Sequence, residues 1–403
     1  MTRSSPGGLE ELRAAVGEAL AAEEPLEIVG GGSKRGLGRP MQTPRTLDLS
    51  RVSGIRDYQP SELVLTAAAA TPVDDIERAL GESGQMLAFE PPDWRALLGT
   101  PQTRPTLGGV LACNLSGPRR VKAGAARDHF LGFRAVSGRA EVFKAGGKVV
   151  KNVTGYDLPK LLAGSYGTLA VLEEVTLKVL PQPERAITVA LCGLDAAGAA
   201  EAMRRALASP HEVSGAVYLP AGSALLSAMP GLVALRLEGP APSVAFRRER
   251  LLALLAAGGD AAMLEEEASA AFWRAVRDLG PFADCADRAV WRVSVAPARG
   301  AAFGAALARS LDLLWYLDWG GGLAWLAVAG AEDGGAAAIR RGIRGEDGRQ
   351  TGHATLIRGS AALRRAVPVF EPQPPALAAL AARVKESFDP RHILNPGRMV
   401  ERS

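Results

Sequence analysis

Glycine-rich runs in the first half of the chain could bring backbone amides close to a ligand. The first, residues 29–38, reads Val-Gly-Gly-Gly-Ser-Lys-Arg-Gly-Leu-Gly and follows the apolar run Leu26–Val29. Consecutive glycines can take positive φ angles, so several N–H groups can turn inward and form a nest for a pyrophosphate. A flexible turn is the alternative interpretation. Neither standard nucleotide motif fits: Arg35 stands where Gly-x-Gly-x-x-Gly needs glycine, and no Gly-Lys-Ser/Thr follows at P-loop spacing.

The second run, residues 105–114, reads Pro-Thr-Leu-Gly-Gly-Val-Leu-Ala-Cys-Asn, which is typical of a loop that leads into a short helix. Gly108 and Gly109 permit close approach by a flat ring or a phosphate. Thr106 and Asn114 can supply side-chain hydrogen bonds to the same ligand. A helix N-cap followed by a tight glycine turn is the alternative for this run.

The third run, Gly164–Leu169, reads Gly-Ser-Tyr-Gly-Thr-Leu and leads into the segment Thr168–Leu180. The alternating apolar and polar residues of that segment predict a strand. A plain turn is again the alternative. Between the second and third runs lie Arg127-Asp128 and the polar stretch Lys151–Asp157. Several weak signals in one part of the chain carry more weight together than each does alone.

Helix and strand patterns place these runs in a first domain, residues 1–181. Strands are expected at residues 26–29, 46–49, 62–68, 130–137 and 140–144, and a helix is expected from Thr71-Pro72 to about Leu80. Pro181-Gln182-Pro183 ends the alternating segment, so we place a domain boundary there.

The second domain, residues 182–366, is predicted to be α+β, with helices on one face of a mainly antiparallel sheet. Strands are expected at residues 187–192, 213–219, 232–237, 290–295, 313–318, 323–328 and 353–357. Five helices are expected between them, at about residues 196–208, 243–257, 266–279, 299–309 and 336–343. A proline-rich linker, residues 367–375, then precedes a final helix, residues 376–388, and a structured tail.

Composition limits the function classes. A chain of 403 residues, 47% hydrophobic and 22% charged, is typical of a globular protein of two or three domains. The net charge of only +4 argues against a nucleic-acid surface. The three cysteines, Cys113, Cys192 and Cys285, are isolated and cannot make a Cys₄ iron–sulfur site. With no signal-peptide pattern and no membrane-length apolar run, we expect a cytoplasmic protein that reaches a membrane only peripherally, through partners.

Taken together, these segments resemble the FAD-binding superfamily of vanillyl-alcohol oxidase and p-cresol methylhydroxylase. Within it, the chain is most similar to the FAD-binding subunits of bacterial glycolate oxidases. The segments that carry the resemblance are Gly30–Ser33, Thr106–Gly109 with Asn114, Arg127-Asp128, the block 149–161, Gly164–Leu169 and Asn395-Pro-Gly397. The more specific match to glycolate oxidases also uses Asp318–Gly321 and Gly352–Thr355 with Arg358.

The resemblance implies a two-lobed FAD-binding domain, an α+β cap domain, and a C-terminal segment, residues 367–403, that returns to the first domain. It implies that the first run and the second run pass the FAD pyrophosphate, that the third lies near the adenosine half, and that Asn395 returns to the flavin. The residues assigned to FAD on this basis are Gly30, Gly31, Gly32, Ser33, Thr106, Gly108, Gly109, Asn114, Gly155, Gly164, Ser165, Gly167, Thr168, Leu169 and Asn395.

The histidines depart from the family pattern. Many relatives attach FAD covalently through a histidine of the first loop, whereas this chain has Ser33-Lys34-Arg35 there, so we predict non-covalent FAD. Relatives that oxidise 2-hydroxy acids carry a histidine cluster in the second domain. This chain has two distant histidines in that domain, so no metal site is predicted. His353 as base and Arg358 as carboxylate clamp are the candidate catalytic pair. Their opposite parity on a strand favours separate roles instead.

Three functions follow from these features. The first is an FAD-binding subunit of a complex that oxidises glycolate to glyoxylate, with a sister FAD subunit and an iron–sulfur subunit that takes the electrons. The second is a self-sufficient FAD oxidoreductase for a small 2-hydroxy acid. The third is a structural subunit whose FAD is non-catalytic or absent. Scarcity of histidine favours the first and third, while the intact glycine runs favour the first and second.

Overall fold

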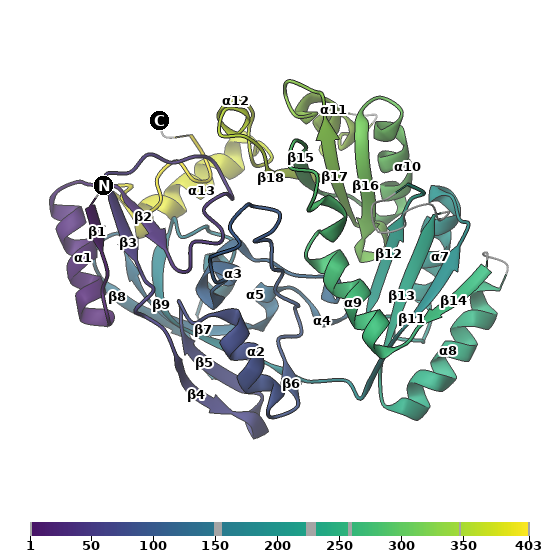
Figure 1. Ribbon diagram of the computed structural model, residues 1–403. Coiled ribbons are helices and arrows are strands. Elements are labelled where there is room, and N and C mark those ends of the chain that lie inside the picture. Colours follow the sequence, from purple (N-terminus) through teal and green to yellow (C-terminus); the bar gives the residue numbers. More distant parts are fainter. Residues whose placement is uncertain (1, 149–154, 223–230, 257–259, 346–347, 402–403) are drawn as a thin grey trace.

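The computed structural model describes residues 2–148, 155–222, 231–256, 260–345 and 348–401. These residues form two lobes that lie side by side (Figure 1). The described residues of the ranges 2–181 and 375–401 form the first lobe, and those of the range 185–369 form the second lobe. In the described part of the chain, no helix is long and apolar enough to cross a membrane.

A small parallel sheet opens the first lobe. Its strands are β1 (Thr2–Ser4), β3 (Arg45–Asp48) and β2 (Leu26–Val29), in that order, and both pairs are parallel. Helix α1 (Leu9–Ala21) packs on this sheet through its apolar face. The C-terminal tail adds to it, because Leu394 forms a parallel bridge with Leu26. The first glycine run therefore leaves β2 at an edge that the chain's own tail covers.

A five-stranded antiparallel sheet forms the other half of the first lobe. Its strand order is β4 (Ile55–Gln59), β5 (Val64–Ala68), β9 (Ala170–Lys178), β7 (Phe130–Ser137) and β8 (Val142–Gly146). A minor pair joins β6 (Gln85–Met86) to β10 (Leu180–Pro181). The short helices and turns around this sheet are η1 (Pro60–Glu62), α2 (Val73–Gly81), α3 (Leu107–Cys113), α4 (Arg120–Ala123), α5 (Ala126–His129) and α6 (Leu158–Leu162).

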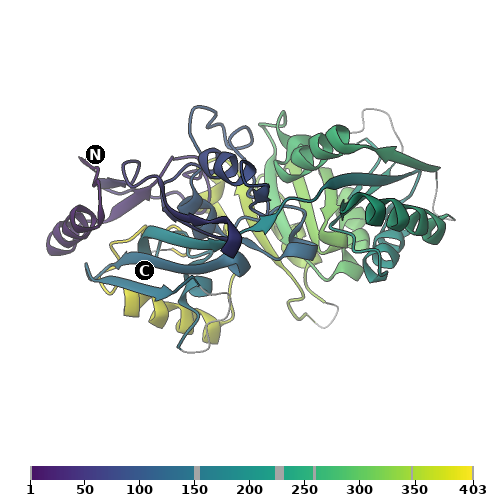
Figure 2. The ribbon, with the colours of Figure 1, turned by 90° about the horizontal axis from the view of Figure 1, so that it is seen from below.

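The C-terminal helix packs back on the first lobe. Figure 2 shows α13 (Pro375–Phe388), in yellow, against the five-stranded sheet, and the ring of Phe388 lies 5.8 Å from that of Phe143 on β8. At the end of this helix, the buried Asp389 accepts hydrogen bonds from the amides of Ile393 and Leu394 at 3.0 and 2.8 Å. This turn directs the tail toward β2.

An eight-stranded antiparallel sheet organises the second lobe. Its strand order is β14 (Asp260–Leu264), β11 (Arg185–Cys192), β13 (Leu232–Gly239), β12 (Gly215–Leu219), β16 (Asp312–Asp318), β17 (Leu323–Ala329), β15 (Ala289–Ser294) and β18 (His353–Arg358). The remaining elements are α7 (Ala196–Ala208), α8 (Ala241–Leu255), α9 (Glu266–Arg277), η2 (Gly280–Phe282), α10 (Pro297–Ala308), η3 (Trp319–Gly321), α11 (Ala336–Gly342) and α12 (Leu363–Ala366). Strand β14 lies outside the expected strands.

The two faces of this sheet have different partners. Helices α7, α8, α10 and α11 pack in the apolar core on one face. The other face carries α9 and meets the first lobe directly, where Trp94 and Trp325 contact edge to face with ring centroids 5.6 Å apart. Residues of β15, β17 and β18 that point to this second face therefore look toward the glycine runs.

Candidate functional site

The glycine runs come together around one groove in the first lobe. Ten of the residues predicted to hold FAD line it: Gly30, Gly31, Gly32, Ser33, Thr106, Gly108, Gly109, Ser165, Gly167 and Asn395. They come from the β2–β3 connection, the start of α3, the turn before β9 and the C-terminal tail. Segments more than 360 residues apart in the sequence thus share one surface.

The first loop presents free backbone donors. Within the described chain, the amides of residues 30–34 find no hydrogen-bond acceptor, although they follow the end of β2 directly. The loop is packed rather than loose: a Cβ added at Gly31 would lie 1.7 Å from the carbonyl oxygen of Arg104, and one at Gly30 would lie 2.7 Å from the Thr106 hydroxyl. The row of unpaired amides fits a pyrophosphate. The loop has no room for side chains at these glycines, and this close packing disfavours the flexible-turn alternative.

The second loop is held against the end of β5. The amides of Leu107 and Gly108 donate to the carbonyls of Thr71 and Ala69 at 3.0 and 2.7 Å. A Cβ at Gly108 would lie 2.8 Å from the Ala69 carbonyl oxygen, so this position requires glycine for the close approach of two backbones. The next amide, of Gly109, has no acceptor among the described residues and faces the same groove.

Asn395 joins the tail to two walls of the groove. Its side-chain oxygen accepts from the Ile28 amide, and its side-chain nitrogen donates to the Tyr166 carbonyl, both at 2.8 Å. A Cβ at Gly167 would lie 2.8 Å from that nitrogen. Both ends of the amide are therefore engaged with protein, so Asn395 sets the shape of the groove.

Two cationic residues that line the groove were not among the residues predicted from the sequence. Lys34 is partly buried, and its desolvation lowers the pKa of its ammonium group; among the described residues, its Nζ hydrogen-bonds the Ser33 hydroxyl, at 3.2 Å. Arg398 donates to the carbonyls of Arg35 and Leu37 at 2.9 Å each and lies 3.5 Å from Glu27. The position of Lys34 directly after the glycine run was a usable signal. A buried positive charge there complements a pyrophosphate.

Five predicted residues lie outside the groove lining. Asn114 ends α3 with φ +49°, and its side-chain oxygen accepts from the Arg127 amide at 3.0 Å. Gly164, Thr168 and Leu169 form the turn behind the wall, where the Thr168 hydroxyl donates to the Ser165 carbonyl at 2.7 Å. Gly155 is exposed and has positive φ, while residues 149–154 of the same block lie outside the described residues.

The candidate pair His353 and Arg358 does not converge. The two residues occupy opposite ends of β18, and the strand bulges between Leu356 and Arg358, so the parity argument for this strand is wrong. The Arg358 guanidinium points between the lobes, where it donates to the backbone carbonyls of Leu97, Phe282, Cys285 and Arg288. Four carbonyl acceptors occupy it, so it is not available as a carboxylate clamp.

His353 lies on the sheet face that looks toward the first lobe. Partial desolvation and the nearby charges of Arg292 and Arg120 lower its pKa, although the side chain is still exposed to solvent, so the neutral imidazole is favoured. His129, by contrast, is buried between the carbonyls of Lys178 and Ala123, at 3.2 and 2.9 Å. Among the described residues, no group of three or more His, Cys, Asp or Glu side chains could hold a metal ion.

Comparison with known proteins identifies the family. The FAD binding domain family matches residues 5–146, and the C-terminal domain of FAD linked oxidases matches residues 369–399. Over 387 residues the chain is 36% identical to the glycolate oxidase subunit GlcE of Escherichia coli, and the match covers 95% of both chains. The chain belongs to the GlcE family of FAD-linked oxidase subunits. It is therefore a flavoprotein of the superfamily predicted from its motifs.

More distant relatives agree on the fold. The chain is 30% identical over 168 residues to the glycolate oxidase subunit GlcD of Bacillus subtilis, a match of 41% of this chain and 34% of that one. The structures of p-cresol methylhydroxylase with substrate bound and of 4-ethylphenol oxidase from Gulosibacter chungangensis superpose with TM-scores of 0.72 and 0.73. Their identities are 13% and 14%, and each comparison covers 99% of this GlcE-family chain and 88% of the other. The predicted α+β architecture is confirmed.

Proposed function

We propose that this chain is the FAD-binding subunit of a complex that oxidises glycolate to glyoxylate. The observation that carries the proposal is the 36% identity to GlcE over 95% of both chains, combined with a groove whose unpaired amides fit a pyrophosphate. In this reaction glycolate loses a hydride from carbon and a proton from its hydroxyl group. Bound FAD supplies the acceptor for the two electrons.

The residues of the chain have separable tasks in this scheme. The amides of residues 30–34 and of Gly109 bind the pyrophosphate non-covalently, with the Lys34 ammonium group beside them. Asn395 closes the groove by linking β2 to the turn at Tyr166. His353 accepts the hydroxyl proton. Arg358 is withdrawn from the candidate catalytic pair, because four backbone carbonyls engage it.

Electrons leave the chain through partners in this proposal. The three isolated cysteines cannot make a Cys₄ iron–sulfur site, and the proposed receiver of the electrons is therefore a partner iron–sulfur subunit. The similarity to GlcD supports a sister FAD subunit in the same complex. We assign any peripheral attachment to the cytoplasmic face of a membrane to those partners.

Flavin spectra of the purified chain test the proposal. The isolated chain should carry FAD, and glycolate should bleach the flavin band near ~450 nm only after the partner subunits are added, because the proposal places glycolate oxidation in the assembled complex. Bleaching of the isolated chain would instead establish a self-sufficient oxidoreductase. A chain purified without a flavin band, and unable to take up added FAD, would establish a structural subunit.

A further inference from the structure

Arginines from opposite lobes lie over the same indole ring. The Cζ atom of Arg120, on α4, is 4.4 Å from the centroid of Trp319, and the Cζ atom of Arg292, on β15, is 5.0 Å from it. Figure 1 shows α4 extending from the first lobe toward the eight-stranded sheet. All three side chains are partly buried, so a small solute can reach them.

Neither of these arginines has a counterion in contact. Among the described residues, no carboxylate lies within ion-pair distance of Arg120 or Arg292, and neither guanidinium donates a hydrogen bond to the protein. Their neighbour in the sequence, Arg119, contrasts with them because it donates to Glu238 at 3.0 and 2.8 Å. Asp128 and Asp318 act on the two unpaired charges only at longer range. Burying a charge without a counterion costs free energy, so the presence of two such arginines here indicates a role other than stabilising the fold.

The residue that carries this indole has a strained backbone conformation. Trp319 has φ +54°, which is unfavourable for a bulky side chain, and its Nε1 donates across the lobe boundary to the Gly117 carbonyl at 3.1 Å. Its amide donates to the Asp318 carboxylate at 2.6 Å. Backbone strain of this kind persists where the surrounding structure enforces it, and it clusters at ligand sites. The ring of this constrained residue contacts both guanidinium groups.

Polar side chains on the same sheet face complete the surroundings. Arg292 is paired with Thr355 and Ser294 with His353, so His353 is a diagonal neighbour of Arg292, roughly 7–8 Å away. Burial and the charge of Arg120 lower the pKa of Arg292 to about 10. The positive charge of Arg292 also acts on Tyr166, whose pKa is raised by burial and whose ring lines the FAD groove. Arg292 thus lies within electrostatic range of a residue that lines the groove.

We propose that Arg120 and Arg292 together bind the carboxylate of a small organic acid between the lobes, with Trp319 as the wall and His353 beside the ligand. Guanidinium forks match carboxylates in geometry as well as charge, and two of them without counterions make an anion subsite. The proposal deepens the function given above, on which it rests for the identity of the acid as a 2-hydroxy acid. It places acid binding in this chain rather than in a sister subunit alone.

Oxalate titration of the FAD-loaded full-length chain tests the subsite, because oxalate carries the carboxylate and lacks the hydrogen that oxidation removes. Binding is measured by calorimetry and by perturbation of the flavin spectrum. Arg120→Gln and Arg292→Gln should each weaken oxalate binding at least about tenfold, since a hydrogen bond to a charged group is lost. Arg292→Lys should give an intermediate loss, because it keeps the charge and loses the fork.

Arg309→Gln is the matched control, because Arg309 is an exposed arginine at the end of α10, and it should bind oxalate like the unaltered chain. Both test variants should melt close to the unaltered chain, because the loss of a cation–π contact with Trp319 is opposed by the relief of repulsion between like charges. Absence of oxalate binding to the unaltered chain, or unchanged binding by both glutamine variants, would overturn the subsite. Oxalate binding without glycolate-dependent flavin reduction in the assembled complex would overturn the proposed function and leave the subsite standing.

Discussion

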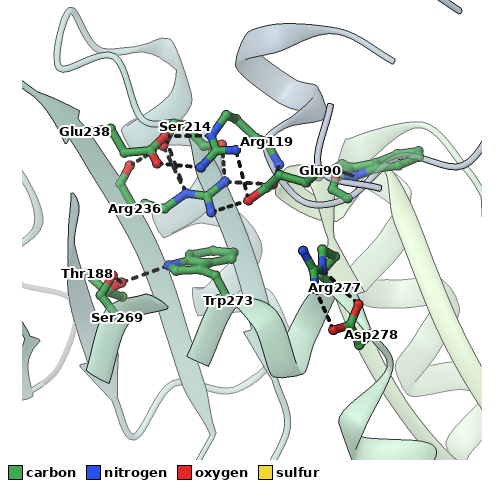
Figure 3. Close-up of polar contacts among 12 residues, drawn as sticks. Glu90, Arg119, Thr188, Ser214, Arg236, Glu238, Ser269, Trp273, Arg277 and Asp278 are labelled. Atoms are coloured by element: carbon green, nitrogen blue, oxygen red, sulfur yellow. Dashed lines mark hydrogen bonds and ion pairs between the residues drawn. The ribbon is translucent and has the colours of Figure 1, made fainter. Parts of the chain in front are cut away.

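Arg236 on β13 and Glu90 in the first lobe form a two-point ion pair, although 146 residues separate them. Nη1 donates to Oε1 at 2.8 Å and Nη2 to Oε2 at 3.0 Å (Figure 3). Arg119 of the first lobe in turn reaches Glu238 of the second, and the ring of Trp273 lies 4.6 Å from Arg236. These four charged side chains are 14% exposed or less. They join the two lobes to each other through buried charged contacts.

Removal of one charge from this network should destabilise the whole chain. Glu90→Gln leaves Arg236 and Arg119 with Glu238 as their only carboxylate in contact among the described residues. Because an uncompensated buried charge remains, we expect the free energy of unfolding to fall by about 3–5 kcal/mol. Denaturant unfolding followed by circular dichroism measures it.

The matched control is an exposed ion pair across the same boundary. Lys122 and Glu212 meet at 2.7 Å with side chains 48% and 60% exposed. Glu212→Gln should cost less than about 1 kcal/mol, since solvent screens such pairs. Equal losses in the Glu90 and Glu212 variants would show that the buried network does not hold the lobes together.

Acid should weaken the same network. Burial alone would raise the pKa of Glu238, but Arg236 and Arg119 outweigh it and lower the pKa to about 2 from 4.5. Because the folded-state pKa is depressed, the stabilisation is fully present above the unfolded value near 4.5 and is lost as pH falls toward 2. A shift of that size corresponds to roughly 3 kcal/mol.

Comparison of the unaltered chain with Glu238→Gln isolates this contribution from that of other carboxylates. Thermal unfolding should show the variant melting well below the unaltered chain at about pH 7, with the gap narrowing as the pH falls from about 4.5 to about 3. A gap that stays constant over that interval would contradict the assignment of the low pKa to Glu238.

Local signals made the fold and the FAD groove predictable from the sequence. Each glycine run is a signal contained within a few residues, and strands such as Leu232–Gly239 begin with a run of apolar residues, Leu232–Leu235. Strand β14, Asp260–Leu264, was missed because its residues are mostly exposed and lack that pattern. This strand lies at the edge of the sheet, and tertiary structure decides which strand takes that position. The sequence alone therefore did not predict it.

Contacts between distant segments were not predictable. Nothing near Glu90 in the sequence indicates Arg236 as its partner, and the bulge that redirects Arg358 leaves no mark in the pattern of β18. Arg120 and Arg292, which lie over the Trp319 ring, belong to a short helix and a strand with no unusual sequence pattern around them. Only the packing of the two lobes shows that they meet over one ring.

A single methyl group in the first loop should reduce FAD affinity. The Cβ of Gly31→Ala would lie 1.7 Å from the Arg104 carbonyl oxygen, so the loop has to move. The amides of the moved loop would then no longer all point into the groove. We expect FAD to bind at least about tenfold more weakly, which corresponds to the lower end of overpacking costs. Gly81→Ala, with no atom within 4 Å of its Cβ, is the control and should retain FAD fully. Fluorescence of released FAD measures both, and full retention by the Gly31 variant would show that the pyrophosphate lies elsewhere.

Asn395 and Asn114 were both predicted to contact FAD, and both have left-handed backbones, with φ +41° and +49°. Only Asn395 lines the groove, where it bonds the Ile28 amide and the Tyr166 carbonyl. Asn395→Ala should therefore lower the free energy of unfolding by about 1–3 kcal/mol and also weaken FAD binding, because the Ile28 amide loses its acceptor and the wall its anchor. Asn114→Ala should lower stability while leaving FAD affinity unchanged, since its side chain bonds the Arg127 amide instead. Parallel FAD titrations of the two variants decide the matter: equal losses of affinity would return Asn114 to the cofactor site, and unchanged affinity in the Asn395 variant would remove the tail from it.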